Sequence, residues 1–433
     1  MSILTIVSNL LFLIISTGLV LKPAKRIVNY ESICSADYAL ALIYIFNCIP
    51  VLMDLVLGVP HYMSWYDAFQ QAIADETTCL IYNSYVIIVM LSLTIYSRHR
   101  WFNDKAYRQN GPVFSSEFVL STWRTPYIDA FIIAIPFIYA VMKGGLSSFT
   151  LYGTLIQRGL STETVSNINQ LIMVGLFFCT TRFFVKKRSL FSSILFIFYL
   201  FLAIWINGKR YIIVTVLFMV FYLYQMRNIG EKKRMNLKIV LPIVIGFIVM
   251  FSAYYILNIK ITSTTETLYS NLRIDFGRDD VSKFVIKKVL LANEKILDYP
   301  GQTFLSAIFM LVPRAIWPQK PYPHYRYLTA AIFGRTIYTI PSGMTPSIFE
   351  MSICNFGWFG IICTCWILIV LCRCIDKSAR LENKLLLLVI LINVLTQSLD
   401  AALSLILVLF VNLLFGKVRF TFGSNKTRVV EHE

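Results

Sequence analysis

Long apolar runs, each about the length of a membrane span, alternate with shorter polar segments along most of the chain. A helix needs about 20 apolar residues to cross the hydrocarbon core of a bilayer. Continuous runs favour helices, because the strands of a membrane barrel alternate between apolar and polar positions. The pattern predicts an all-α polytopic membrane protein with about eleven transmembrane helices, at 3–21, 37–57, 79–97, 127–142, 167–183, 189–206, 211–225, 238–258, 347–372, 384–399 and 401–416.

Composition supports this class. Hydrophobic residues make up 57% of the 433 residues and charged residues only 15%, whereas soluble domains contain about 25% charged residues. The formal net charge of +17 would suggest nucleic acid binding in a soluble protein. Here most Lys and Arg flank the apolar runs, where they set the orientation of spans, so no nucleic-acid partner is expected.

The basic residues predict which way the chain faces. If eleven spans alternate, 25 of the 40 Lys and Arg fall on one side, in the loops at 22–36 and 98–126, in three further clusters and in the tail. The opposite loop at 58–78 holds three acids and no Lys or Arg. Because basic loops stay in the cytoplasm, the N-terminus is predicted to be external and the tail cytoplasmic.

A long polar interruption falls on the external side and divides the sequence. We predict helices one to eight in residues 1–258, a large external loop that contains the active-site region in 259–346, and helices nine to eleven with the tail in 347–433. The loop holds eleven basic residues and six acids. Its apolar piece Gln302–Val312 is too short to span and predicts a short helix at the membrane surface.

Arginine dominates the candidate chemistry of this external side. Its planar, permanently charged guanidinium suits phosphate oxygens, and such groups could stabilise the charge on a departing lipid diphosphate. The alternative is ordinary ion pairing, for which Arg273–Asp275 and Arg278–Asp279 are close in sequence. Cysteine spacing does not match a zinc site, so neither a metal nor another cofactor is expected. The predicted diphosphate-binding residues are Arg210, Arg273, Arg278, Arg314, Lys320 and Arg335.

Three residues are candidates for catalysis. Arg314 lies between Pro313 and the Trp317-Pro318 pair. Glu350 lies near the outer end of a predicted span, where an ionisable group is costly and suggests function; pairing with an arginine is the alternative. His324 could accept a proton near neutral pH, or could simply be a hydrogen-bonded loop residue.

The run Pro313-Arg314-x-x-Trp317-Pro318-x-Lys320-Pro321 and the exit Glu350…Asn355-Phe356-Gly357…Gly360 resemble the Wzy-type O-antigen and capsule repeat-unit polymerases of bacteria. The turn Asn207-Gly208-Lys209-Arg210 resembles the Gly-x-Arg element of that family. The likeness covers about the second half of the chain. By position, the resemblance implies that Arg210, Arg278, Arg314 and Glu350 are the functional residues of the family in this sequence.

The resemblance implies a GT-C-like fold and a glycosyltransferase of the bacterial inner membrane with its active site facing the periplasm. Its substrates would be undecaprenyl-diphosphate-linked oligosaccharides among membrane lipids, and a chain-length regulator protein is a further expected partner. An O-antigen ligase, which shares the donor, is the nearest alternative. A transporter of lipid-linked oligosaccharides is a less favoured one, because the two halves of the chain show no inverted repeat.

Overall fold

The computed structural model describes most of the predicted helices. The residues that it describes are 2–29, 34–62, 66–110, 120–121, 123–149, 160, 162–185, 190–207, 211–230, 269–270, 272–274, 277–309, 312, 314–340, 344, 346–378, 380–397 and 399–415. Every regular element in these ranges is helical, which confirms the all-α prediction. Arg210 and the predicted span 238–258 lie outside the described residues.

Residues group into two compact units. Unit 1 comprises Met1–Ser116, Leu217–Ala379 and Leu387–Leu403, and unit 2 comprises Glu117–Val216, Arg380–Leu386 and Ser404–Glu433. This grouping cuts across the three-part division predicted from the sequence, which stays a prediction.

The first spans of unit 1 are long apolar helices. They are α1 (Ile3–Val28), the continuous run α2 (Ser35–Ile43), η1 (Tyr44–Cys48) and α3 (Ile49–Leu57), and α5 (Glu76–Asn110). The π-helical turn η1 lies between two α-helical halves of one span. Length and apolar composition qualify three stretches here as membrane spans, Ile3–Val28, Ser35–Leu57 and Glu76–Arg100.

The last helices of the chain lie wholly or partly in unit 1. α16 (Ile348–Phe356) and α17 (Phe359–Lys377) follow one another, then come α18 (Leu381–Thr396) and α19 (Leu399–Phe415). α17 qualifies as a span. α10 (Tyr211–Gly230) runs from unit 2 into unit 1.

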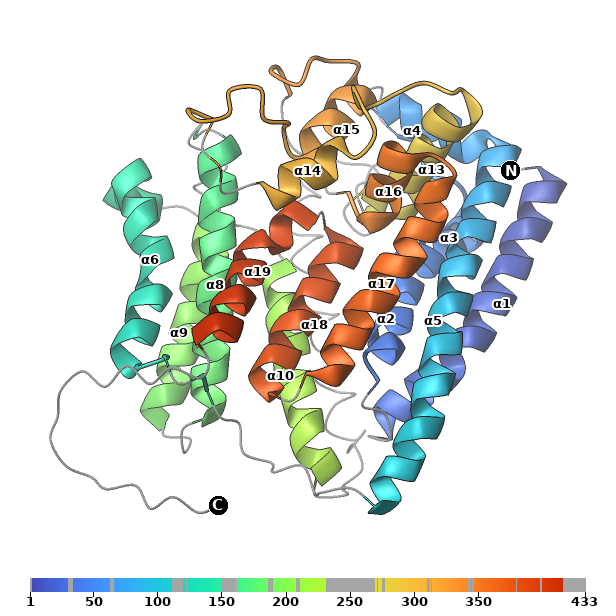
Figure 1. The fold of residues 1–433 in the computed structure, drawn as a ribbon. Helices are drawn as coiled ribbons and strands as arrows, with labels where there is room; N and C mark the ends of the chain where they lie inside the picture. The colour runs from blue at the N-terminus through green and yellow to red at the C-terminus, as the bar shows by residue number, and fades with distance from the viewer. Residues whose placement is uncertain are drawn as a thin grey trace, which may run out of the picture. The chain divides into compact units, whose positions relative to one another are not determined.

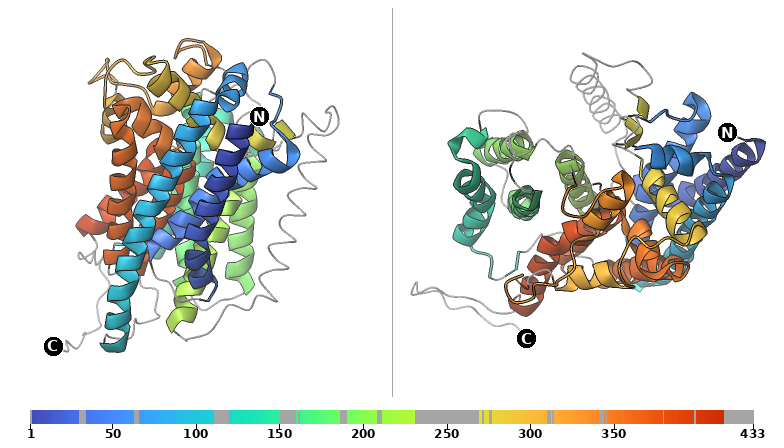
Figure 2. Two further views of the ribbon diagram at one scale, coloured as in Figure 1. Left: turned by 90° about the vertical axis from the view of Figure 1, so that its right-hand side faces the viewer. Right: turned by 90° about the horizontal axis from the view of Figure 1, so that it is seen from above.

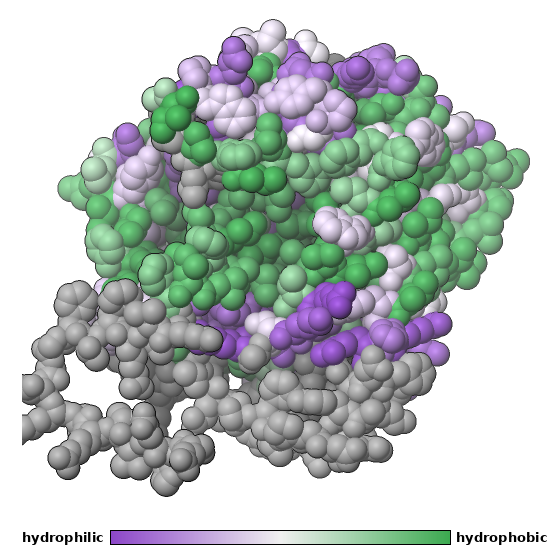
Figure 3. All heavy atoms as spheres, in the orientation of Figure 1, coloured by the Kyte–Doolittle hydropathy of each residue, from purple (hydrophilic) through white to green (hydrophobic). Residues whose placement is uncertain are grey.

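Short helices gather at one end of unit 1. They are α4 (Asp67–Ala74), α13 (Asp279–Val285) continued by η4 (Ile286–Leu291), α14 (Gln302–Ile308) and α15 (His324–Phe333). Figures 1 and 2 show them with α16 at the end where α1 and α5 begin. Figure 3 shows apolar side chains along α1, α5 and α17 and polar side chains above them. This is the division expected for membrane spans capped by a polar segment.

The opposite ends of four spans meet through polar contacts. Arg26 Nη2 donates to Asp37 Oδ1 at 2.5 Å and to Ser97 Oγ at 2.6 Å. Asp376 accepts hydrogen bonds from the Ser35 backbone N–H at 2.9 Å and the Tyr96 hydroxyl at 3.0 Å. The contacts join the end of α1, the start of α2 and the far parts of α5 and α17.

Unit 2 contains α6 (Pro126–Gly144), η3 (Leu146–Phe149), α8 (Thr162–Val185) and α9 (Leu190–Asn207). Arg124 is buried there and pairs with Asp129 at 2.9 Å and with Glu382 at 2.7 Å. The Arg182–Asp129 distance is 3.5 Å. Two arginines counted for orientation in the sequence thus also hold helices together by ion pairs.

The predicted span 347–372 is wrong as a single helix. Gly357 adopts φ 56° and ends α16, and α17 starts two residues later. A Cβ on Gly360 would lie 2.4 Å from the Ser352 carbonyl oxygen, so only glycine permits this close backbone approach. Glu350 therefore belongs to a short buried helix rather than to the edge of a span. The described helices are consistent with a polytopic protein, while the total of eleven spans stays a prediction.

Candidate functional site

Two arginines lie over one tyrosine ring in the predicted external loop. Arg314 Cζ is 3.8 Å from the centroid of the Tyr322 ring, and Arg326 Cζ is 4.9 Å from it. Both distances are in the range of cation–π contacts. We call Arg314, Tyr322 and Arg326 the Tyr322 cluster.

Backbone carbonyls fix Arg314 in place. Its Nη1 donates to the Lys320 carbonyl at 2.7 Å and its Nη2 to the Pro321 carbonyl at 3.2 Å. Lys320 Nζ reaches back to the Val312 carbonyl at 3.1 Å. Pro321 also limits the freedom of this loop, because its ring fixes φ. The segment thus closes into a loop around the guanidinium.

Helices α14 and α15 anchor the cluster. The Tyr327 hydroxyl accepts hydrogen bonds from the Tyr322 backbone N–H at 3.2 Å and from Gln302 Nε2 at 2.8 Å. Ser306 Oγ donates to the Pro321 carbonyl at 3.1 Å. Asn355 of α16 in turn bonds the Thr303 backbone N–H and hydroxyl, at 3.2 and 2.6 Å. The Asn355-Phe356-Gly357 motif therefore supports the helix beneath the cluster.

In the described part of the chain, no carboxylate pairs with the arginines of the cluster. Among the described residues, the ion pairs within 4.0 Å include neither Arg314 nor Arg326. Tyr338 packs edge-on against Tyr322 at 5.8 Å and is 73% exposed. The arrangement offers guanidinium groups to an anion and an aromatic face to a sugar. Arg335 follows α15 and is exposed.

Arg273 lies in a different place, fully buried among carboxylates. It donates to Asp54 at 2.8 Å, to Asp279 at 2.8 and 2.9 Å and to Asp280 at 3.0 Å. Lys283 Nζ is 2.8 Å from Asp279 Oδ2. Burial opposes ionisation of Asp279, yet Arg273 and Lys283 hold its pKa below the ordinary value. This geometry favours the ion-pair alternative for Arg273, with Asp54, Asp279 and Asp280 as its partners.

The side chain of Arg278 caps the C-terminal end of α18. Its Nε donates to the carbonyl of Thr396, the last residue of α18, at 2.9 Å. Its backbone N–H donates to the Phe46 carbonyl within η1 at 3.2 Å. A cation is favourable at a helix C-terminus, where carbonyl groups lack partners. Arg278 thereby ties the segment before α13 to η1 and to the end of α18.

Glu350 forms a capping box at the start of α16. One carboxyl oxygen accepts hydrogen bonds from the Ser347 backbone N–H, at 2.7 Å, and from the Ser347 hydroxyl. The other accepts from the Ser282 hydroxyl of α13. Glu350 is 0% exposed. Its contacts hold α16 to α13 and satisfy donors that a helix start leaves unpaired.

His324 begins α15 and is also fully buried. Its backbone N–H donates to Asp400 Oδ2 at 3.2 Å. Neither ring nitrogen has a hydrogen-bond partner in the described part of the chain. Burial lowers the pKa of His324 to about 3, so the ring is neutral at physiological pH.

The structure thus brings Arg314 and Lys320 together, apart from Arg273, Glu350 and His324. Arg273 and Glu350 both contact α13. Sequence reasoning did not select Arg326, one of eleven basic residues in the loop, or Asp54. For Arg326, the available signal was its position four residues after Tyr322, near the start of a helix. For Asp54, it was the presence of an acid at the end of an apolar span.

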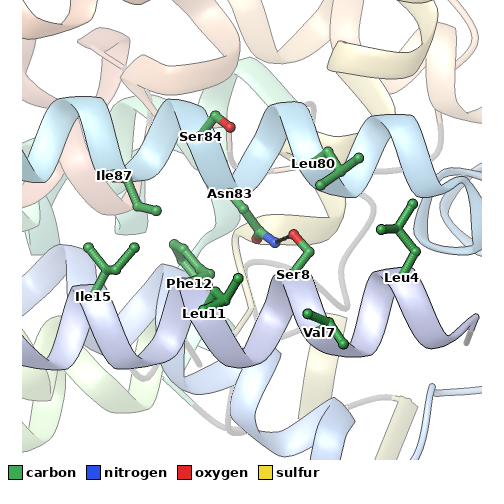
Figure 4. A pocket seen from close by; sticks show the side chains of 10 residues that line it. All are labelled: Leu4, Val7, Ser8, Leu11, Phe12, Ile15, Leu80, Asn83, Ser84 and Ile87. Atoms are coloured by element: carbon green, nitrogen blue, oxygen red, sulfur yellow. Dashed lines mark hydrogen bonds between the residues drawn. The ribbon is translucent and has the colours of Figure 1, made fainter.

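A groove opens between α1 and α5, with a volume of about 220 Å³ (Figure 4). Its walls are mostly apolar and include Leu11 and Ile87, with Ser8, Asn83 and Ser84 as the polar residues. Asn83 Nδ2 crosses between the helices and donates to Ser8 Oγ at 2.9 Å. Such polar bridges hold membrane helices together.

The fold and the Tyr322 cluster define a multi-pass helical membrane protein with a basic, aromatic cap. The sequence model of a known family, "O-antigen polysaccharide polymerase Wzy", matches residues 2–413. The chain belongs to the Wzy O-antigen polymerase family, which confirms the resemblance predicted from the sequence and extends it over nearly the whole chain. Comparisons with curated proteins and with solved structures give no match.

Proposed function

We propose that the protein transfers a growing glycan from undecaprenyl diphosphate to the next lipid-linked repeat unit, at the periplasmic face of the bacterial inner membrane. Membership of the Wzy family supports a polymerising glycosyltransferase acting on lipid-linked oligosaccharides. The undecaprenyl carrier, the periplasmic face and catalysis without a metal are part of the proposal. A GT-C-like fold and a chain-length regulator as partner also belong to it.

The observation that carries the proposal is the Tyr322 cluster. As the acceptor hydroxyl attacks the anomeric carbon, the bond to the carrier phosphate breaks and negative charge grows on the diphosphate. Arg314 and Arg326, held over one ring without carboxylate partners in the described part of the chain, suit that charge. A preorganised donor of this kind contributes about 10²–10³ in rate. Lys320, joined to the same loop, is placed to contribute further charge.

Roles for Arg210, Arg278 and Arg335 remain part of the proposal as predicted diphosphate ligands. Arg335 is exposed just beyond α15, and Arg278 lies at the end of α18.

Alanine substitution tests the cluster directly. Arg314→Ala and Arg326→Ala should each reduce polymer to products with a single repeat, when tested by complementation of a strain that lacks the chain and by gel ladder. Lys288→Ala is the matched control, because Lys288 is a cation of the same segment paired with Glu294 at 3.1 Å. Long chains from both arginine variants, at wild-type protein levels in the membrane, would reject the proposal. A bare lipid A core in the deletion strain would instead indicate the ligase alternative.

A further inference from the structure

The buried ion cluster around Arg273 carries an unbalanced formal charge. It contains two cations, Arg273 and Lys283, and three carboxylates, Asp54, Asp279 and Asp280. All five residues are at most 3% exposed. When every group is ionised the formal charge is –1, and an unpaired buried charge is costly. One added proton would bring the formal charge of the cluster to zero.

The hydrogen bonds of Arg273 show which of the three carboxylates is held most weakly. Arg273 Nη2 carries two hydrogens but lies near three acceptors, Asp54 Oδ2 at 2.8 Å, Asp279 Oδ2 at 2.9 Å and Asp280 Oδ1 at 3.0 Å. At least one carboxylate must share a hydrogen. The longest of the three contacts is the one to Asp280.

Asp280 is also the least supported carboxylate of the three. Asp54 accepts two hydrogen bonds from Arg273 and one from the Tyr269 hydroxyl at 2.7 Å. Asp279 accepts two from Arg273 and one from Lys283. Asp280 has its single shared contact with Arg273 and one hydrogen bond from the Tyr62 hydroxyl. A proton therefore belongs on Asp280.

The neighbouring elements supply no further cation to Asp280 in the described part of the chain. The groups that act on it are Arg273, Asp279, Lys283 and Asp54. α5 contributes Tyr82, whose ring lies 5.2 Å from Lys283 Nζ, and buried Cys79. α4 packs Phe69 against Phe284 and leaves Asp67 exposed. α16 contributes Glu350, which Ser282 bonds, and η4 directs Lys287 to the Gln71 carbonyl and Lys288 to Glu294.

We propose that the Arg273 cluster is a proton-dependent clasp, in which a proton on Asp280 keeps α13 closed against the outer end of α3. Burial raises the pKa of Asp280 to about 7. Loss of the proton leaves three buried carboxylates for two cations, and opening of α13 relieves this by exposing Asp280 to water. Because α13 also bonds Glu350 through Ser282, acidification would make the short-helix end of unit 1 more rigid.

The sign follows from proton binding. Below pH 7 the closed state holds a proton that the open, solvated state, with a carboxyl pKa near 4, does not hold. The opening equilibrium therefore rises with pH, by at most about tenfold per pH unit, and becomes flat above pH 7.

Hydrogen–deuterium exchange of the full chain in detergent tests this. Exchange of α13 amides, corrected for intrinsic rates, should increase from pH 5.5 to 7 in the wild type and then level off. Asp280→Asn mimics the protonated carboxyl and should remove the pH dependence. Asp298→Asn, an acid of the same external segment bonded to Gln302, should behave as the wild type.

Tyr62→Phe provides a second, milder variant if Asp280→Asn does not fold. It removes a hydroxyl that stabilises the ionised carboxylate, so the levelling-off should move to higher pH. A wild-type profile that is flat or falls with pH overturns the clasp, as does a Tyr62→Phe profile identical to the wild type or an Asp280→Asn profile that keeps the wild-type slope. None of these readings depends on polymerase activity, so the clasp can fail while the proposed function stands.

Discussion

Replacing Glu350 by glutamine separates a structural from a catalytic role of this residue. The carboxyl group accepts hydrogen bonds from two serine hydroxyls and one backbone N–H, and it is fully buried. Glutamine has the same shape. Its carbonyl oxygen can accept both Ser347 donors, and its amide can donate to Ser282 after that hydroxyl rotates. We therefore expect Glu350→Gln to lose less than about 1 kcal/mol, the net worth of one hydrogen bond.

Alanine at the same position should cost more. It removes the capping interaction, worth about 1 kcal/mol, and leaves the buried Ser347 backbone N–H unsatisfied, which costs about 1–3 kcal/mol. Hydroxyl groups can turn to other acceptors, whereas this N–H cannot. The sum is about 2–4 kcal/mol.

Two measurements on the same variants decide the question. Thermal unfolding in detergent should rank the midpoints as wild type, then Glu350→Gln, then Glu350→Ala, and Ser347→Ala should show part of the loss without touching a carboxyl group. The polysaccharide ladder of Glu350→Gln should resemble the wild type. A folded Glu350→Gln variant with activity reduced about 10²–10⁴-fold, the worth of a proton-transfer group, would refute the structural role and favour the catalytic prediction.

Three further outcomes are expected. Arg273→Met should destabilise unit 1 strongly, by about 3–5 kcal/mol, because it leaves buried carboxylates unpaired; full retention of the unfolding midpoint in detergent would contradict the burial of the cluster. Gly360→Ala should lower the same midpoint, because its Cβ would meet the Ser352 backbone at 2.4 Å, whereas Gly18→Ala, with open space around it, should not. His324→Leu should keep polymerase activity. It should also be spared the loss of stability that the wild type shows on acidification from about pH 6.5 toward 3, because the folded state holds His324 with a pKa of about 3 and the unfolded state binds the proton first. Loss of activity in a stable variant would instead support a catalytic role of His324.

Hydropathy predicted five membrane-spanning helices that the described part of the structure also contains, because the thickness of the bilayer sets the length of an apolar run. The predicted span 3–21 is the apolar part of α1, which continues to Val28 through Lys25 and Arg26. The water-facing ends of a helix carry no apolar signal, so the predicted span ends before the helix does. Where a run stays apolar across a turn, the same signal fails, and the break between α16 and α17 is not visible until the positive φ of Gly357 is known.

Ionic partners were the harder part of the site. Arg273 pairs with Asp54, 219 positions earlier, whereas sequence reasoning can only weigh neighbours such as Asp275. Glu350 looked costly at a membrane edge, yet its serine partners come from its own helix start and from α13. Arg314 was selected for its proline-rich surroundings, and these do supply the carbonyl groups that hold it.

The π-helical turn at Tyr44–Cys48 sets the angular register of the span that contains it. An α-helix turns about 100° per residue, so removing one residue from this turn would rotate everything beyond it by roughly that angle. Asp54 would then face away from Arg273, while Asp37 on the other half would keep its bond to Arg26. Asp37 and Asp54, at the two ends of this span, can thus each face its own arginine because the π-helical turn lies between them.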